Sequence, residues 1–281
     1  MKKLILPLIL LNVLGGVGSG IMLWLSNGNL MWLGSFLTTF PLPFLLMVLT
    51  NAFGIARTSA RLPFIQLLSI AGLVLAGLTL LEMQGSQTTS DFVAVGLTVF
   101  GALFVQWYVW SFSSYGRKKS KSIVKGRTLP ELQLHRLDGS SVSSSSFVGS
   151  KTLLVFFRAN WCPFCVNQLK EVLARADKLK RSGIQVKFIS NQGTENSKQL
   201  TEKLALPAHF EILQDDDLKA AKALGIADIG GLPAGMSGYP EDTVMATVIT
   251  LDEKGAVTFG DETDNYRVRP HPDTFLPAFG G

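Results

Sequence analysis

The first 112 residues carry four long apolar runs separated by short polar loops. Each run is about 20 residues long, which is the length that an α-helix needs to cross the ~30 Å hydrocarbon core of a bilayer. We therefore predict a four-helix transmembrane region over residues 1–116. The four runs are Leu4–Leu25, Leu30–Phe53, Leu62–Met83 and Phe92–Phe112.

Two pairs of residues predict how these helices are shaped and packed. Pro41 and Pro43 lie within the second run and are expected to kink it. Gly16 and Gly20, four residues apart in the first run, are expected to permit close approach of a neighbouring helix.

Basic residues near the ends of the runs predict the orientation. The first and third loops contain none, so the positive-inside rule places both chain termini in the cytoplasm. A signal peptide is the alternative for the first run, but that run is too long and lacks a small-x-small cleavage site before a polar segment. The ten basic residues are Lys2, Lys3, Arg57, Arg61, Arg117, Lys118, Lys119, Lys121, Lys125 and Arg127.

The apolar half is expected to act as an anchor. Its acidic residues, Glu82 and Asp91, lie at the edges of the runs, and it contains no cysteine. A transporter or proton relay would normally carry ionisable groups at mid-membrane, and a thiol relay would need cysteines there. A site for a lipid, a quinone or a partner helix remains the alternative role.

The charge changes sign after residue 127. Residues 1–127 hold 10 basic and 2 acidic residues and residues 128–281 hold 16 and 19, which gives formal charges of +8 and −3. The basic stretch Arg117–Arg127 predicts a juxtamembrane linker that lies against anionic lipid headgroups. Nucleic-acid binding is disfavoured because the half that follows is net acidic.

Strand and helix patterns alternate over residues 128–281 and predict an α/β domain, a mixed sheet with helices on both faces. The predicted strands are Glu131–Leu137 in an edge hairpin, Thr152–Phe157, Ile184–Ser190, Val244–Leu251 and Ala256–Phe259. The predicted helices are Pro163–Arg181, Glu195–Ala205, Asp217–Leu224 and Pro272–Ala278.

The two cysteines of the chain lie where a predicted strand passes into a predicted helix, in the segment RANWCPFC at 158–165. Cys162 would face the unpaired N–H groups of the first helical turn, which lower the pKa of such thiols to about 3.5–7.5. Pro163 suits this turn because it has no N–H to leave unpaired, and Phe164 is interpreted as a hydrophobic flank. Arg158 either favours the thiolate by its charge or is solvated at the strand end.

Metal binding is the competing use of a cysteine pair, and the sequence disfavours it. There is no second cysteine pair. The histidines at 135, 209 and 271 are not spaced from the Cys162–Cys165 pair as metal ligands would be. Asp215–Asp217 is expected to cap a helix rather than to bind a metal. No cofactor is expected.

Residues 128–281 resemble the thioredoxin-like superfamily, and more closely its redoxin branch, the peroxiredoxin-like (AhpC/TSA-type) proteins. The resemblance rests on FFRANWCPFC, LQDDDLKAAKALGI at 213–226, ITLDEKG at 249–255 and NYRVRPHPDTFL near the end. It implies a thioredoxin fold in which Cys162 attacks a disulfide or oxidised sulfur, Cys165 resolves the mixed intermediate and Trp161 shields the site.

Several positions depart from the patterns of these families. Phe156 stands where thioredoxin has a buried acid, so water is expected to assist deprotonation of Cys165. Ala246 falls near the position where thioredoxin has the cis-proline of its substrate-binding groove. Ala159 and Val155 replace the Thr or Ser and the Pro of true peroxiredoxins, which weakens the expectation of direct peroxide reduction. The dipeptide between the cysteines is similar to that of glutaredoxins and implies a link to glutathione.

Together these features predict a membrane-anchored thiol–disulfide oxidoreductase in a bacterial inner membrane, with the redox domain on the cytoplasmic side. A periplasmic placement, common among anchored relatives, is the alternative. The implied partners are protein or small-molecule disulfides, the thioredoxin or glutathione system as electron donor, and membrane lipids, but no nucleic acid. A redox-sensing module without turnover and a thiol-dependent peroxidase are the alternative functions.

Overall fold

The computed structural model describes residues 4–83, 85 and 87–279, and the chain divides into two compact units. The helical unit comprises Met1–Gly54, Thr58–Ser113 and Pro233–Gly235. The thiol unit comprises Ile55–Arg57, Ser114–Leu232 and Met236–Gly281.

The helical unit contains three helices that are long and apolar enough to cross a membrane, or four if a bent pair is one span. The bend of 40° lies between Leu30–Thr39 and Pro41–Ala52, so the second apolar run is not one straight helix. The prolines predicted to kink this run begin the segment after the break. The elements are α1 (Ile5–Leu25), α2 (Leu30–Thr39), α3 (Pro41–Phe44), the π-turn η2 (Leu45–Leu49), α4 (Thr50–Ala52), α5 (Pro63–Glu82), α6 (Thr89–Trp107) and η3 (Tyr108–Phe112).

Glycines set the closest helix contacts of this unit. A Cβ on Gly34 of α2 would lie 2.6 Å from the carbonyl oxygen of Gly72 of α5, so the two backbones touch there. A Cβ on Gly16 of α1 would likewise lie only 2.9 Å from the Cβ of Phe40. A Cβ on Gly20 would be at an ordinary van der Waals distance, 3.5 Å, from Phe36. Of the two glycines predicted to permit close approach, only Gly16 is closely approached.

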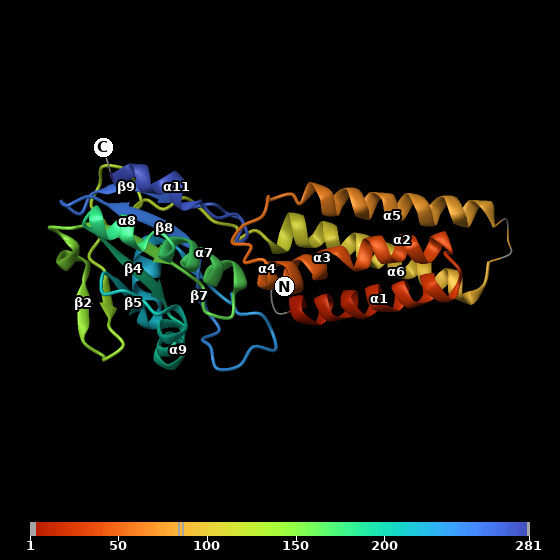
Figure 1. Ribbon diagram of the computed structural model, residues 1–281, viewed down its shortest axis with the longest axis horizontal. Helices are drawn as coiled ribbons and strands as arrows, with labels where there is room; N and C mark the ends of the chain where they lie inside the picture. Colours follow the sequence, from red (N-terminus) through yellow and green to blue (C-terminus); the bar gives the residue numbers. More distant parts are fainter. Residues whose placement is uncertain (1–3, 84, 86, 280–281) are drawn as a thin grey trace. The chain divides into compact units, whose positions relative to one another are not determined.

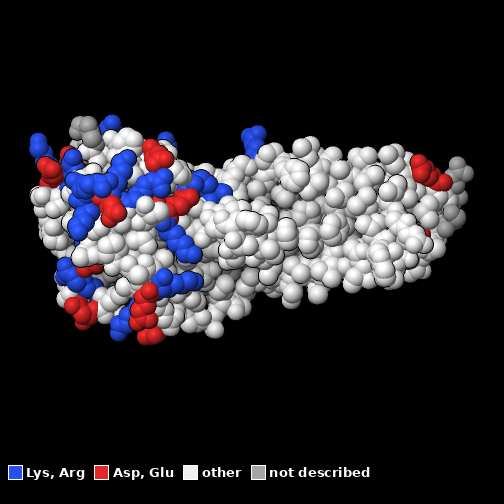
Figure 2. All heavy atoms as spheres, viewed as in Figure 1, with Lys and Arg blue, Asp and Glu red and all other residues white. Residues whose placement is uncertain are grey.

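The outward faces of these helices are apolar. Trp24, Leu67 and Leu81 are 79%, 64% and 75% exposed, and many other leucines, valines and phenylalanines are also exposed. On the face drawn in Figure 2, the helices show hardly any charged side chains, whereas Lys, Arg, Asp and Glu gather on the thiol unit. An apolar surface of this extent suits lipid or a partner protein rather than water.

The thiol unit is built on a seven-stranded mixed sheet in the order β2-β1-β5-β4-β3-β8-β9 (Figure 1). The central strands β3, β4 and β5 are parallel, and β8 joins β3 in antiparallel fashion. The strands are β1 (Gln133–His135), β2 (Ser141–Ser143), β3 (Lys151–Phe156), β4 (Ile184–Ser190), β5 (Phe210–Gln214), β8 (Thr247–Leu251) and β9 (Val257–Asp261), with β6 (Ala227–Asp228) and β7 (Thr243–Val244) in a separate pair.

Both faces of this sheet are buried. Leu154 and Phe156 of β3 pack in one core cluster with Leu224 of α10, while Leu153 and Val155, which point to the opposite face, are also fully buried. The helices are α7 (Pro163–Leu173), α8 (Ala176–Arg181), α9 (Thr194–Leu204), α10 (Lys219–Leu224) and α11 (Pro272–Phe275), with 3-10 turns η4 (Ser144–Phe147), η5 (Asp216–Leu218) and η6 (Leu276–Phe279). The mixed α/β sheet with flanking helices agrees with a thioredoxin-like fold.

Several predicted element bounds need correction. The helix expected over 217–224 begins at Lys219, because Asp217 and Leu218 have positive φ angles. The helix expected over 163–181 is broken into α7 and α8, because Arg175 leaves the helical conformation with φ −104° and ψ 11°. The strand expected over 244–251 is two strands, β7 and β8. Strand β5 was not predicted, since its short apolar run has no alternation to separate it from a helix.

Residues 117–127, expected to form a linker on a lipid surface, fold with the thiol unit. Ile123 is 7% exposed and belongs to the core cluster. It packs against Gly260, where an added Cβ would lie 2.4 Å from the Cγ2 of Ile123. The backbone also pairs with β9, because Gly126 N donates to Val257 O at 2.8 Å and Val257 N donates to Arg127 O at 2.9 Å. This segment therefore contributes to the core.

Candidate active site

Strand β3 and helix α7 place the two cysteines at the end of the sheet. The chain leaves β3 at Phe156 and reaches Cys162, which lies at the N-cap of α7 with extended backbone angles. Cys165 N and Val166 N donate to Cys162 O at 3.0 and 3.1 Å, which closes the first turn. Pro163 stands at the start of this helix, as predicted.

The turn that carries the cysteines is held by the chain that follows β4. Asn160 N donates to Gln192 Oε1 at 2.7 Å, and Tyr239 Oη donates to Asn160 Oδ1 at 2.6 Å. Phe164, the expected hydrophobic flank, is 2% exposed and packs edge-on against Tyr266. These contacts hold in place the turn that carries the two cysteines.

Both cysteines are free thiols and are buried, Cys162 at 2% and Cys165 at 0% exposure. The hydrogen bond to Cys165 and burial raise the pKa of Cys162 well above its ordinary value. Burial also acts to raise the pKa of Cys165, but the hydrogen bond from Cys162 and the charge of Arg269 lower it well below its ordinary value. These directions make Cys165 the sulfur on which a thiolate is more stable and Cys162 the sulfur that holds its proton more tightly.

This distribution differs from the sequence-based expectation of a lowered pKa at Cys162. The helix N-terminus does favour a thiolate there, but Cys162 is fully buried and gives its proton to a hydrogen bond with the neighbouring sulfur. A guanidinium in contact with Cys165 outweighs the partial charge of the helix end, because a full charge at close range in a buried site acts more strongly than about half a charge.

Arg269 is the functional residue that the sequence analysis missed. Its Nη2 donates to Cys165 Sγ at 3.4 Å, and its Nη1 donates to Gln168 Oε1 at 3.4 Å. Burial alone would lower the pKa of Arg269, but the charge of Cys165 raises it, so the guanidinium stays protonated. The motif NYRVRPHP contained this arginine, but nothing in its pattern indicated which of its two arginines faces a cysteine. The charge of Arg269 thus lowers the pKa of Cys165, in the absence of an acid at position 156.

Arg158 is buried rather than solvated, which decides between the two interpretations of this residue. It is 5% exposed, and its guanidinium lies 4.8 Å from the ring centre of Trp161 and 5.4 Å from that of Tyr266. Its Nη2 donates to Gly231 O at 2.5 Å and lies 3.9 Å from Asp228 Oδ2. The charge of Arg158 acts on both cysteines in the direction that favours the thiolate. Trp161, expected to shield the site, covers this guanidinium.

Two further side chains meet the segment before β8. Ala246 N donates to Tyr115 Oη at 3.2 Å, and Arg117 Nη2 donates to Ala246 O at 3.3 Å. The described residues contain no cis peptide bond, so Ala246 does not reproduce the cis-proline of thioredoxins. Phe156, at the position of thioredoxin's buried acid, is fully buried.

The remaining candidates lie away from the thiols or serve the fold. His135 contacts Asp216, His209 contacts the carbonyl of Ala176, and His271 caps α11. Asp215 accepts from Ala220 N and Ala221 N at 2.8 Å, as expected of a helix cap, but it is 1% exposed and does not face solvent. Within residues 4–83, 85 and 87–279, no group of three His, Cys, Asp or Glu is arranged to hold a metal ion.

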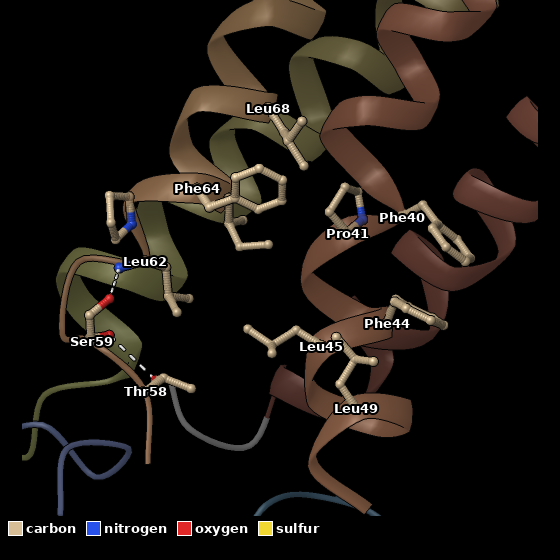
Figure 3. A pocket seen from close by; sticks show the side chains of 12 residues that line it. Phe40, Pro41, Phe44, Leu45, Leu49, Thr58, Ser59, Leu62, Phe64 and Leu68 are labelled. Carbon is tan, nitrogen blue, oxygen red and sulfur yellow. Dashed lines mark hydrogen bonds between the residues drawn. The ribbon is translucent and has the colours of Figure 1, made fainter. Parts of the chain in front are cut away.

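The helical unit has a hollow of about 540 Å³ between the α2–η2 segment and the start of α5. Pro41 and Leu45 lie on one side of it and Phe64 and Leu62 on the other (Figure 3). The polar residues of its lining are Thr58 and Ser59, and the Ser59 hydroxyl accepts from Leu62 N. No titratable side chain is among the lining residues of this hollow, which are otherwise apolar.

Comparison with known proteins agrees with the thiol chemistry. The AhpC/TSA family model matches residues 125–259, which include both cysteines. Chloroplastic peroxiredoxin Q of Triticum aestivum is 30% identical over 138 residues, 49% of this chain and 58% of that protein. Its counterpart in Sedum lineare is 31% identical over 121 residues, 43% of this chain and 64% of that protein. The chain thus matches less than two thirds of the length of either relative.

Among solved structures, reduced Prx3 of Vibrio vulnificus is similar over 57% of this chain and 99% of its own, with 23% identity and a TM-score of 0.47. Arg269, Tyr266 and Tyr115 lie outside the residues that the family model matches. The cysteine pair itself lies in the matched part. The thiol unit therefore contains an AhpC/TSA redoxin domain whose homologues are peroxiredoxins.

Proposed function

We propose that this protein is a membrane-anchored, thiol-dependent oxidoreductase that reduces hydroperoxides with the Cys162–Cys165 pair. The observation that carries the proposal is the pair of buried guanidinium groups of Arg269 and Arg158, whose charges favour the thiolate form of both Cys162 and Cys165; Arg269 contacts Cys165 directly. A buried thiol is inert unless a nearby cation stabilises its thiolate. The peroxiredoxin relatives support a hydroperoxide as the oxidant.

The reaction in this proposal starts from the pair with one shared proton. The proton of Cys162 passes to Cys165 through the hydrogen bond between the sulfurs, and the Cys162 thiolate attacks the terminal oxygen of the hydroperoxide. The O–O bond breaks, the alkoxide takes a proton from water and leaves as the alcohol, and Cys162 becomes a sulfenic acid. Cys165 then attacks the Cys162 sulfur, an S–S bond forms, and the sulfenic oxygen leaves as water. The two sulfurs lose two electrons and the peroxide gains them.

The return to the dithiol requires a reductant. A thiolate from the glutathione or the thioredoxin system attacks the Cys162–Cys165 disulfide, and a second thiol resolves the mixed disulfide. The two protein sulfurs regain two electrons, and the donor leaves as its own disulfide.

The anchoring part of the proposal rests on the helices. Their length, hydropathy and apolar outer faces suit a bilayer. Residues Ile55–Arg57, between the second and third predicted spans, pack with the thiol unit. If those helices span a membrane, this loop and the thiol unit share one side, and the basic residues of the loop favour the cytoplasmic side.

The test uses the full chain in detergent micelles and measures hydrogen peroxide and cumene hydroperoxide consumption with a thiol reductant. We expect loss of turnover on the order of 10³-fold or more in Cys162→Ser, because the attacking atom is gone. Cys165→Ser is expected to accumulate a Cys162 sulfenic acid that dimedone labels once per chain. Arg175→Ala, on the exposed side of the thiol unit, is the control.

Two results would contradict the proposal: peroxide consumption that persists in Cys162→Ser, or a wild-type pair that hydroperoxide cannot convert to the disulfide. Disulfide reduction is the second candidate, which the free dithiol supports, and an insulin-reduction assay measures it on the same samples. Consumption over many turnovers also separates an enzyme from a redox sensor, which would react once and stop.

A further inference from the structure

The segment Ser114–Arg117, here called the entry segment, is bound along one edge of the thiol unit. Tyr115 N donates to Asp264 O at 2.9 Å, and Arg117 N donates to Asp264 Oδ1 at 2.6 Å. Ser114 forms an isolated antiparallel bridge with Asn265 and a hydrogen bond to the Asp264 carboxylate. The entry segment is therefore fixed by backbone and side-chain bonds to the loop that leads to Arg269.

Two side chains of the entry segment form hydrogen bonds with the N–H and the carbonyl of Ala246. The Ala246 N–H is bound to Tyr115 Oη and the Ala246 carbonyl to Arg117 Nη2, which also donates to Thr247 Oγ1 at 2.7 Å. The guanidinium of Arg117 lies 5.5 Å from the ring centre of Tyr115, so the two side chains form one stacked cover.

This cover lies at the end of the sheet where the thiols are. Thr247 pairs with Phe156 in the antiparallel β8–β3 ladder, so Ala246 is level with Phe157, one residue before Arg158. Burial raises the pKa of Tyr115, and the charges of Arg269 and Arg158 oppose that effect. The same two guanidinium charges thus act on the Tyr115 phenol and on Cys165.

An extended polypeptide that brought a disulfide or dithiol to this site would bind by pairing with free backbone groups beside the sulfurs. At Ala246 those groups are already occupied. A small molecule needs no such pairing, and Arg158 Nε and Trp161 Nε1 are buried donors with no partner among the described residues. Acceptor oxygens of a small thiol or hydroperoxide would satisfy them.

We propose that the entry segment restricts the Cys162–Cys165 pair to small reactants, so that a low-molecular-weight thiol rather than a protein dithiol reduces its disulfide. The inference rests on the proposed function. Two molecules of the small thiol are consumed: the thiolate of the first attacks one sulfur and breaks the S–S bond, and the second displaces the first from the mixed disulfide. One small-molecule disulfide leaves, and Cys162 and Cys165 regain two electrons and their protons.

The experiment oxidises the full chain in micelles with diamide, so that it does not depend on peroxide chemistry. The oxidised chain is then mixed with glutathione or with reduced thioredoxin, and thiols are counted by alkylation and mass spectrometry after acid quenching. We expect glutathione to reduce the wild-type disulfide at least tenfold faster per thiol than thioredoxin does. In Tyr115→Ala/Arg117→Ala we expect the thioredoxin rate to rise at least tenfold and the glutathione rate by less than threefold.

Single variants keep the test valid if the double variant does not fold. Tyr115→Ala and Arg117→Gln each free one backbone group of Ala246, and each is expected to shift the rate ratio in the same direction by a smaller factor. Lys119→Ala, at an exposed position two residues after the entry segment, is the matched control and should leave the ratio unchanged.

A wild-type chain that thioredoxin reduces as fast as glutathione, or a ratio that none of the cover variants shifts, would overturn the inference while leaving the proposed function in place. A pair that neither diamide nor hydroperoxide converts to a disulfide would overturn both.

Discussion

The guanidinium of Arg269 lies 3.4 Å from the sulfur of Cys165, a residue 104 positions earlier in the chain. This contact places a full positive charge beside a buried thiol and lowers the pKa of Cys165, the inner sulfur. The partial charge of the helix N-terminus at Cys162 is thus weaker than the full charge of Arg269 as a source of thiolate stabilisation.

Replacing Arg269 is expected to change the pH dependence of thiol reactivity. Because the folded pKa of Cys165 is lowered, wild-type thiolate is present above that pKa and is lost only as the pH falls through it. Arg269→Met should move the midpoint of iodoacetamide labelling upward by about 1–3 pH units, the size of an ion-pair effect. Labelling rates from pH 5 to 10 measure this, and an unchanged profile would contradict the assignment. Arg175→Met, at an exposed ion pair with Asp273, is the control.

Arg57 is expected to hold Arg269 in place from the loop between the second and third predicted spans. Its Nε donates to Arg269 O at 3.1 Å, and its guanidinium forms a two-point ion pair with Glu171 of α7. Because the pair is partly exposed, Arg57→Ala should lower labelling at pH 7 by only about two- to fivefold. Arg61→Ala, which loses a contact with Trp110 instead, should not alter labelling. Equal effects of the two variants would show that Arg57 does not position Arg269.

The crossing of α2 and α5 predicts a strong response to one added methyl group. In Gly34→Ala the new Cβ would lie 2.6 Å from a backbone oxygen, so the helices must separate, at a cost of about 1–3 kcal/mol. Gly77→Ala in α5 and Gly96→Ala in α6 meet no atom within 4 Å and should raise stability by about 0.5–1 kcal/mol through helix propensity. Thermal unfolding of the three variants in one detergent measures the difference. A Gly34→Ala chain as stable as the controls would refute the contact.

Membrane orientation is tested by reporter fusions. With the thiol unit in the cytoplasm, green fluorescent protein fused after Gly281 should fluoresce and alkaline phosphatase at the same place should be inactive. The physical basis is the absence of basic residues from the first and third loops, against ten at the opposite ends. Phosphatase activity at the C-terminus would instead place the redox pair in the periplasm.

Local patterns were enough for much of this chain. Twenty-residue apolar runs predict long apolar helices, and Pro41 predicts the break in the second of them, because these depend on composition and on one missing N–H. The strand, turn and helix around Cys162 follow in the same way from neighbouring residues. The sequence did not predict the break at Arg175, because the stripe of apolar residues continues past it although the helical backbone conformation is interrupted there.

The electrostatics of the cysteine pair depend on long-range contacts that no local pattern encodes. Strand β8 enters the sheet beside β3 from almost 100 residues away, and the chain after β9 returns Arg269 to Cys165. Tyr115 and Arg117 reach Ala246 from more than 125 residues earlier. Charge–charge interactions follow distance in space, not in sequence, so the sulfur that carries the charge and the groups that cover it were set by the folding of distant segments onto one end of the sheet.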